Sequence, residues 1–161
     1  MTKTLSVECR MDKKLISMIC SGNNVTSGHK YRNNLMADLK NKNLSIDFYG
    51  RSHNPFQKKE EALADYCFSF VVENGKYSDY YTEKIMDCFA LGTIPIYYGS
   101  PDIGSRFDSE GIIILDSEFD INSLTIDLYY SKLDHIKNNF DLEKKTVIAD
   151  DELFTKIEKY I

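Results

Sequence analysis

Short apolar runs alternate with amphipathic segments along most of the chain. The apolar runs have the length of strands, and the segments between them carry apolar positions at helical spacing. The predicted strands are Leu15–Cys20, Leu44–Tyr49, Cys67–Val72, Thr93–Tyr98 and Gly111–Leu115. The predicted helices are Tyr31–Asn41, Gln57–Tyr66 and Glu83–Leu91, followed by a short helical segment around Ile103 and a helical part from Phe119 onward. The run Cys67–Val72 is almost wholly apolar, which is typical of a central parallel strand.

This alternation predicts the fold class. It indicates an α/β protein with a Rossmann-like, mostly parallel sheet and helices on both faces. We expect the domain to span residues 14–161, after an N-terminal extension or linker remnant at residues 1–13, and no internal repeat marks a further domain. Ligands of such sheets bind beyond the carboxyl ends of the strands. The loops of interest are therefore Ser21–Lys30, Gly50–Phe56, Glu73–Tyr81 and Gly99–Asp102.

The charge and the composition indicate which classes of ligand and which cellular location to expect. The 161 residues include 20 basic and 25 acidic side chains, for a net charge of −5. Proteins that bind nucleic acid usually show a basic excess, so nucleic acid is not expected as a ligand. No apolar run approaches the ~20 residues of a membrane span, and the polar start Met1–Arg10 is unlike a signal peptide. Four scattered cysteines predict free thiols. We expect a cytoplasmic protein, or one held peripherally at a membrane through a partner.

The first candidate site is the segment Ser21–Arg32, SGNNVTSGHKYR. Its small residues allow the backbone to approach a ligand, and the N-terminus of the helix that follows favours anions. Lys30 and Arg32 add positive charge, and His29 lies beside them. The segment is neither G-x-G-x-x-G nor a P-loop. On these residues alone, both cations are more simply interpreted as solvated helix residues.

The second candidate site follows the central strand and runs from Glu73 to Lys84. Asn74 can bond a hydroxyl or a base edge, and Tyr80 can stack or form a hydrogen bond. Glu83 suits a ribose diol because a carboxylate accepts two hydrogen bonds, and Lys84 suits a diphosphate. The alternative is that Glu83 only favours the helix dipole and that Lys84 is exposed.

Familiar catalytic and metal-binding motifs are missing from the sequence. It contains no G-x-S-x-G and no H-E-x-x-H, and its three histidines lack the spacing of metal ligands. In a third cluster, Gly99-Ser100-Pro101, the glycine and the proline are explained by the turn that they form. No metal site is predicted.

The segment Tyr66–Pro101 reads YCFSFVVENGKYSDYYTEKIMDCFALGTIPIYYGSP. It closely resembles the signature of the α-1,3-fucosyltransferases, glycosyltransferase family 10. In that family a strand ending in F-x-x-x-E-N leads to a Y-x-T-E-K helix and then to a G-T-I-P-I-Y-x-G-S-P-like segment. The similarity extends from about Lys14 to Phe140, and a block this long is far more specific than a short motif.

The resemblance implies one half of a GT-B glycosyltransferase, in which two Rossmann-like domains face a cleft. It implies binding of GDP-fucose and inverting α-1,3 transfer of fucose to an N-acetylglucosamine or glucose unit of a glycan, without a metal cofactor. By motif, Arg32 and Lys84 would hold the diphosphate and stabilise the leaving group, and Glu83 would bind the ribose. The full implied donor-binding set is Arg32, Asn74, Tyr80, Glu83, Lys84 and Glu73, with Asn33 alongside.

One departure from the family concerns the acceptor. Full-length members carry an N-terminal acceptor domain that usually supplies the general base. The predicted donor domain starts about ten residues after Met1, so we find no general base and expect an acceptor-domain partner or a missing N-terminal half. The alternatives are one subunit of a two-chain enzyme, a fragment, a non-catalytic nucleotide-sugar-binding or interaction module, or a glycosyltransferase using another nucleotide sugar.

Overall fold

A five-stranded sheet forms the centre of the protein, seen in a computed structural model that describes residues 12–20, 22–42 and 44–157. The sheet order is β2-β1-β3-β4-β5, and all neighbouring strands are parallel. The strands are β1 (Lys14–Ile19), β2 (Ile46–Tyr49), β3 (Tyr66–Val72), β4 (Ile94–Tyr98) and β5 (Ile113–Ile114). The predicted α/β class with a parallel sheet is confirmed. The expected N-terminal extension, residues 1–13, lies almost wholly outside the described residues.

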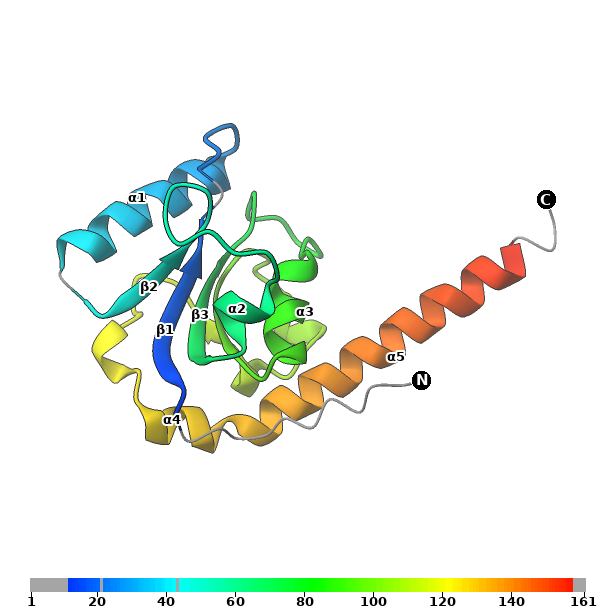
Figure 1. Cartoon of the computed structure of the whole chain (residues 1–161). Helices are drawn as coiled ribbons and strands as arrows, with labels where there is room; N and C mark the ends of the chain where they lie inside the picture. The colour runs from blue at the N-terminus through cyan, green and yellow to red at the C-terminus, as the bar shows by residue number, and fades with distance from the viewer. Residues whose placement is uncertain (1–11, 21, 43, 158–161) are drawn as a thin grey trace.

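Helices cover both faces of the sheet (Figure 1). They are α1 (Ser27–Asn41), α2 (Glu60–Leu63), α3 (Glu83–Ala90), α4 (Ile126–Ser131) and α5 (Leu133–Ile157), with 3₁₀ turns η1 (Ile103–Ser105), η2 (Ser109–Gly111) and η3 (Ile121–Ser123). From β1 to β2 the chain steps in one direction along the sheet, and from β2 through β4 it steps in the other. Right-handed crossovers therefore place α1 on one face and α2 and α3 on the other. Helix α5 packs against α3 and η2.

The core is built on β3, whose seven residues are all buried. Side chains alternate between the two faces of a strand. Phe68 contacts Tyr129 of α4 and Phe70 contacts Phe119, with ring centroids 6.2 and 6.0 Å apart. On the other face, the Ser69 hydroxyl donates a hydrogen bond to the Ser17 carbonyl oxygen and accepts one from the Ser17 hydroxyl. The prediction of a central buried strand is confirmed.

Two predicted helices have different bounds in the structure. The helix expected over Gln57–Tyr66 is only the single turn of α2, so that prediction was wrong. Tyr66 instead begins β3, where it pairs with Lys14 and its hydroxyl donates to Asp47 Oδ2 at 2.6 Å. Helix α1 begins four residues before the predicted start because Thr26 caps it, accepting a hydrogen bond from the backbone N–H of His29 at 3.1 Å.

The C-terminal part is less continuous than predicted. The segment from Phe119 to Thr125 contains only the short turn η3, and α4 and α5 follow as separate helices. The first turns of α5 are fixed to η2 through Asp108, whose carboxylate contacts His135 Nδ1 at 2.8 Å. Asn139, fully buried, accepts from the Asp108 N–H and donates to its carbonyl oxygen.

The Asp108 contacts predict a pH-dependent stability. The hydrogen bond from His135 lowers the pKa of Asp108 below its usual value. Ionised Asp108 therefore stabilises the fold above about pH 4, near the unfolded-state pKa, and this contribution is lost as pH falls through the folded-state pKa. We expect Asp108→Asn to reduce the free energy of unfolding by about 1 kcal/mol at pH 7. Urea unfolding at pH 7 and pH 3 checks this, and an equal loss at both values would contradict it.

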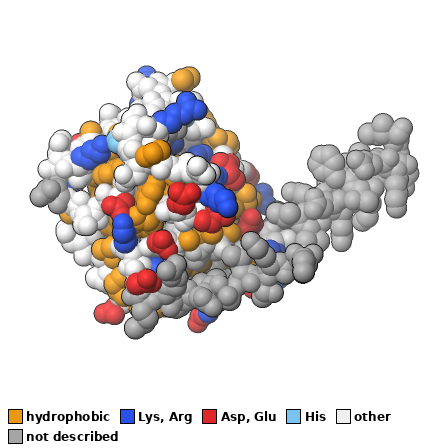
Figure 2. Space-filling model, viewed as in Figure 1, with side chains coloured by type: hydrophobic (Ala, Val, Ile, Leu, Met, Phe, Trp, Pro, Cys, Tyr) orange, Lys and Arg blue, Asp and Glu red, His pale blue; other side chains and the backbone are white. Residues whose placement is uncertain are grey.

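Charges of both signs are mixed over the surface. On the face seen in Figure 2, acidic side chains lie among basic ones. Any affinity for an anionic ligand must therefore come from a local arrangement of charges and helix ends. In the described part of the chain, no helix combines the length and the apolar character that a membrane span requires.

Candidate functional site

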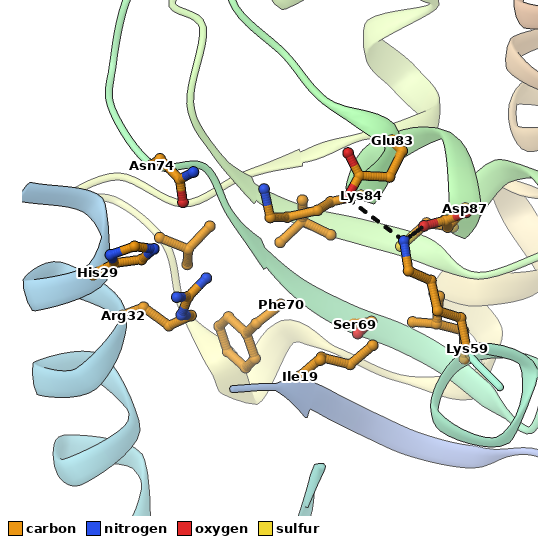
Figure 3. A pocket seen from close by; sticks show the side chains of 14 residues that line it. Ile19, His29, Arg32, Lys59, Ser69, Phe70, Asn74, Glu83, Lys84 and Asp87 are labelled. Atoms are coloured by element: carbon orange, nitrogen blue, oxygen red, sulfur yellow. Dashed lines mark hydrogen bonds and ion pairs between the residues drawn. The ribbon is translucent and has the colours of Figure 1, made fainter. Parts of the chain in front are cut away.

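A cavity of about 260 Å³ opens at the carboxyl ends of β1 and β3. At this point the strand order reverses, which is where open α/β sheets bind ligands. The floor is formed by the end of β3 and by Ile19 of β1. The walls come from three helical elements: α1 contributes His29 and Arg32, the α2 region contributes Lys59 and Leu63, and α3 contributes Glu83, Lys84, Asp87 and Cys88 (Figure 3).

Helix α1 reaches this cavity because its first turn lies directly against the loop after β3. The Gly28 N–H donates to the Asn74 carbonyl oxygen at 3.1 Å. A Cβ atom at Gly28 would lie 2.0 Å from the carbonyl oxygen of Glu73 and 2.6 Å from the carbonyl carbon of Asn74. No side chain fits in that space, so the approach requires glycine. The result is that His29 and Arg32 are carried to the mouth of the cavity.

His29 presents a neutral imidazole to the cavity. Its Nδ1 accepts hydrogen bonds from the backbone N–H groups of Val25 and Thr26, both at 3.3 Å. That arrangement places the ring proton on Nε2. Burial, together with the positive charges of Arg32 and Lys84, lowers the pKa of His29 below its usual value. The ring is thus a hydrogen-bond donor at neutral pH.

Arg32 is a buried cation at the same end of the cavity. Its side chain comes from the second turn of α1, and only 5% of the residue is exposed. Burial lowers the pKa of the guanidinium, while Cys20 and Glu73 oppose that shift. Arginine nevertheless remains charged at neutral pH. The structure therefore holds a desolvated positive charge beside the N-terminus of α1, where an anion is favoured.

Lys84 is held in place by a fully buried carboxylate, that of Glu73. Its Nζ donates to Glu73 Oε2 and to Thr82 Oγ1, both at 2.9 Å. Glu73 also accepts from the Thr82 N–H at 2.9 Å and from the Thr82 hydroxyl. Two of the three ammonium protons of Lys84 are used in this way, and the third remains for a ligand. The lysine is thus oriented at the N-terminus of α3 before any ligand binds.

Three charged side chains border the other part of the cavity. Lys59 forms an ion pair with Asp87 and lies 3.6 Å from Glu83 Oε1. Partial burial opposes ionisation of Glu83, but its own backbone N–H and the charges of Lys59 and Lys84 outweigh this effect and lower its pKa. Asp87 follows Glu83 by one helical turn, so both project from the same side of α3.

The structure brings most of the predicted site residues together. Arg32, Asn74, Glu83 and Lys84 all line the cavity. The others lie outside the cavity lining. Glu73 is buried beneath Lys84, and Tyr80 packs against Tyr77. Asn33 donates to the Asn23 carbonyl oxygen, and Lys30 is exposed. Their roles in ligand binding stay predictions.

Sequence reasoning missed Lys59 and Asp87. Lys59 lay inside a helix that was predicted too long, which hid its place at the edge of the cavity. Asp87 could have been found, because it stands four residues after Glu83 in a helix. Within the described residues, no group of three or more histidine, cysteine or acidic side chains is arranged to hold a metal ion.

Comparison with known proteins assigns this arrangement to a family. Residues 10–135 match the family model described as glycosyltransferase family 10 (fucosyltransferase), C-terminal part. The GDP-fucose protein O-fucosyltransferase 3 of Rattus norvegicus is 38% identical, over 47% of this chain and 19% of that protein. The alpha-(1,3)-fucosyltransferase FucT of Helicobacter pylori is 35% identical, over 55% of this chain and 15% of that protein. The chain thus spans less than a fifth of the length of these relatives.

Solved structures show the same fold. A crystal structure of an alpha1,3-fucosyltransferase superposes with a TM-score of 0.58 and 25% sequence identity, over 79% of this chain and 38% of that one. A crystal structure of alpha1,3-fucosyltransferase with GDP-fucose superposes with a TM-score of 0.53, over 78% of this chain and 34% of that one. The sheet and its helices therefore correspond to about a third of those structures.

Proposed function

Because the chain belongs to glycosyltransferase family 10, as its C-terminal fucosyltransferase domain, we propose that it binds GDP-fucose as the donor half of a fucosyltransferase. The observation that carries the proposal is the pair of fixed cations at the switch point of the sheet. Arg32 and Lys84 line one cavity, each near the N-terminus of a helix. Two positive side chains and two helix ends that favour anions suit a diphosphate.

The relatives support donor binding as the shared property. One relative is named as a protein O-fucosyltransferase and another as an alpha-(1,3)-fucosyltransferase, so their names give different acceptors or linkages. The match covers 47% of this chain for the first relative and 55% for the second, and the first name also contains GDP-fucose. Residues 10–135 match one model of the family, and a part shared by enzymes with different acceptors is best explained by their common donor.

In the proposed reaction, an acceptor hydroxyl oxygen attacks the anomeric carbon of fucose. The bond from that carbon to the β-phosphate oxygen breaks, inversion results, and GDP leaves with additional negative charge. Arg32 and Lys84 would stabilise that charge more strongly in the transition state than in the ground state, which is the requirement for catalysis. The Glu83 carboxylate would hold the ribose hydroxyls.

The acceptor side of the proposal lies outside these residues. We assign the acceptor as an N-acetylglucosamine or glucose unit of a glycan, joined in α-1,3 linkage. The proton of its hydroxyl would pass to a general base on an acceptor domain, and we expect transfer to require that domain. Donor binding alone does not require it, so binding is the property to test in this chain.

Arg32 and Lys30 provide a matched pair for testing the diphosphate site. Both are cations of α1, but Arg32 lines the cavity and Lys30 is exposed. We expect Arg32→Met to weaken GDP binding about 10–100-fold, because a charge-assisted hydrogen bond contributes about 1.5–3 kcal/mol. Lys30→Met should leave affinity unchanged. Calorimetric titration of both variants with GDP measures this, and equal affinities would refute the assignment of Arg32.

A further inference from the structure

The charged side chains along the cavity are arranged so that a nucleoside diphosphate could lie beside them, with its diphosphate, ribose and base in that order. Figure 3 shows Arg32 and His29 at one end, Lys84 and then Glu83 between, and Lys59 at the opposite end. If the diphosphate lies at Arg32 and Lys84 and the ribose at Glu83, the base continues toward Lys59. This placement rests on the proposed function.

The walls at that end suit a flat ring. Leu63 of α2 and Cys88 of α3 are both fully or nearly fully buried, and with Ile19 they give the cavity an apolar lining. Burial raises the pKa of the Cys88 thiol far above its usual value, so this residue stays neutral. Apolar walls with a few placed polar groups are the usual composition of a small-molecule site.

The charged groups at that end are the ion pair of Lys59 and Asp87, and the polar residue Ser69 also lines the cavity. Lys59 donates to Asp87 Oδ2, and within the described residues no donor bonds Asp87 Oδ1. The side chains of Lys59 and Asp87 are 43% and 30% exposed, and both residues line the cavity. The pair therefore offers a hydrogen-bond donor next to an open acceptor.

That pattern is complementary to one nucleobase. The Watson–Crick edge of guanine has the O6 acceptor beside the N1–H and N2–H donors. On adenine the order is reversed, with an N6–H donor beside the N1 acceptor. We propose that Lys59 and Asp87 form the guanine-reading subsite of the donor site, with the Lys59 ammonium donating to O6 and the Asp87 carboxylate accepting from N1–H and N2–H. Watson–Crick-edge hydrogen bonding is a general means of base recognition.

Exchange of one carboxylate for an amide tests this subsite. Asp87→Asn replaces an acceptor with a donor, while xanthine carries an O2 acceptor where guanine carries N2–H. We expect the parent chain to bind GDP more tightly than IDP, ADP or XDP. In Asp87→Asn we expect GDP affinity to fall about 10–100-fold and XDP affinity to rise about tenfold or more. A residue with only a structural role would not reverse the preference between two bases.

Lys59→Met and Glu60→Gln complete the test. Lys59→Met removes the donor to O6, and we expect it to reduce the preference for GDP over ADP about tenfold. Glu60→Gln alters an exposed carboxylate of α2 that does not line the cavity, and its affinities should equal those of the parent. Circular dichroism confirms that each variant is folded.

The outcomes separate this inference from the proposed function. If the parent binds GDP but neither variant changes the ratio of GDP to XDP or to ADP affinity, the guanine assignment is overturned and GDP binding stands. If the folded parent binds none of the nucleotides, the proposed function itself fails. A reversed GDP-to-XDP preference in Asp87→Asn is the result that supports the subsite.

Discussion

Lys84→Met is expected to weaken GDP binding about 100-fold, near the upper end of what one charge-assisted contact contributes. The variant removes the ammonium proton that remains for a phosphate oxygen. It also removes the ion pair of the fully buried Glu73 carboxylate with Lys84, while the hydrogen bonds from Thr82 remain. Removing one partner of a buried ion pair is costly, so we expect the free energy of unfolding to fall by about 3 kcal/mol as well.

A double variant separates these two effects. In Glu73→Gln/Lys84→Met both charges are removed, and the amide oxygen of glutamine can still accept hydrogen bonds from Thr82. We expect stability to recover most of the loss while GDP affinity stays low. The control is Lys76→Met, because Lys76 is an exposed cation of the neighbouring loop that lies over the Tyr98 ring. Parent-like GDP affinity in Lys84→Met would remove this lysine from the diphosphate site.

Gly28→Ala is expected to destabilise the fold by about 2 kcal/mol, because overpacking against a rigid neighbour costs about 3 kcal/mol and is only partly offset. The new methyl group would meet backbone atoms of Glu73 and Asn74, which cannot rotate away. The higher helix propensity of alanine returns only about 1 kcal/mol. Helix α1 must therefore shift, and Arg32 shifts with it. We expect the melting temperature to fall by about 4–8 °C, since a domain of this size loses about 2–4 °C per kcal/mol.

Gly104→Ala is the matched control for Gly28→Ala. A Cβ atom at Gly104 would lie 3.5 Å from the Ser109 Cβ, an ordinary contact, and the residue is exposed. Thermal unfolding with and without GDP compares the two variants. Gly28→Ala should lose both stability and stabilisation by GDP, whereas Gly104→Ala should keep both. Unchanged stability of Gly28→Ala would show that the contact between α1 and the loop after β3 is not close.

The fold was largely predictable because strand length and helical spacing are local properties. Cys67–Val72 is apolar apart from Ser69, and the structure buries all of β3. The exceptions are segments whose structure depends on distant residues. Tyr66 has helical spacing from Ala62 and Leu63, but its hydroxyl is bonded to Asp47 and its backbone pairs with β1. That tertiary pairing overrides the local pattern.

Part of the site was also predictable, because the position of a residue after a strand end can be recognised in the sequence. Arg32, Asn74, Glu83 and Lys84 follow strand ends, and a parallel sheet collects such residues at one edge. The burial of Glu73 beneath Lys84 depends on how α3 packs. Sequence spacing alone does not give that packing. The glycine requirement at Gly28 is likewise a property of two segments that meet only in the folded chain.

Donor binding is tested most directly by calorimetric titration of the full chain with GDP-fucose in the presence of EDTA. We expect saturable binding of one GDP-fucose per chain, competition by GDP, and no effect of the chelator, because Arg32 and Lys84 supply the positive charge. The contradicting result is a folded chain that shows no saturable binding of GDP-fucose or GDP. Binding that disappears with EDTA would contradict the assignment of that charge to the two side chains.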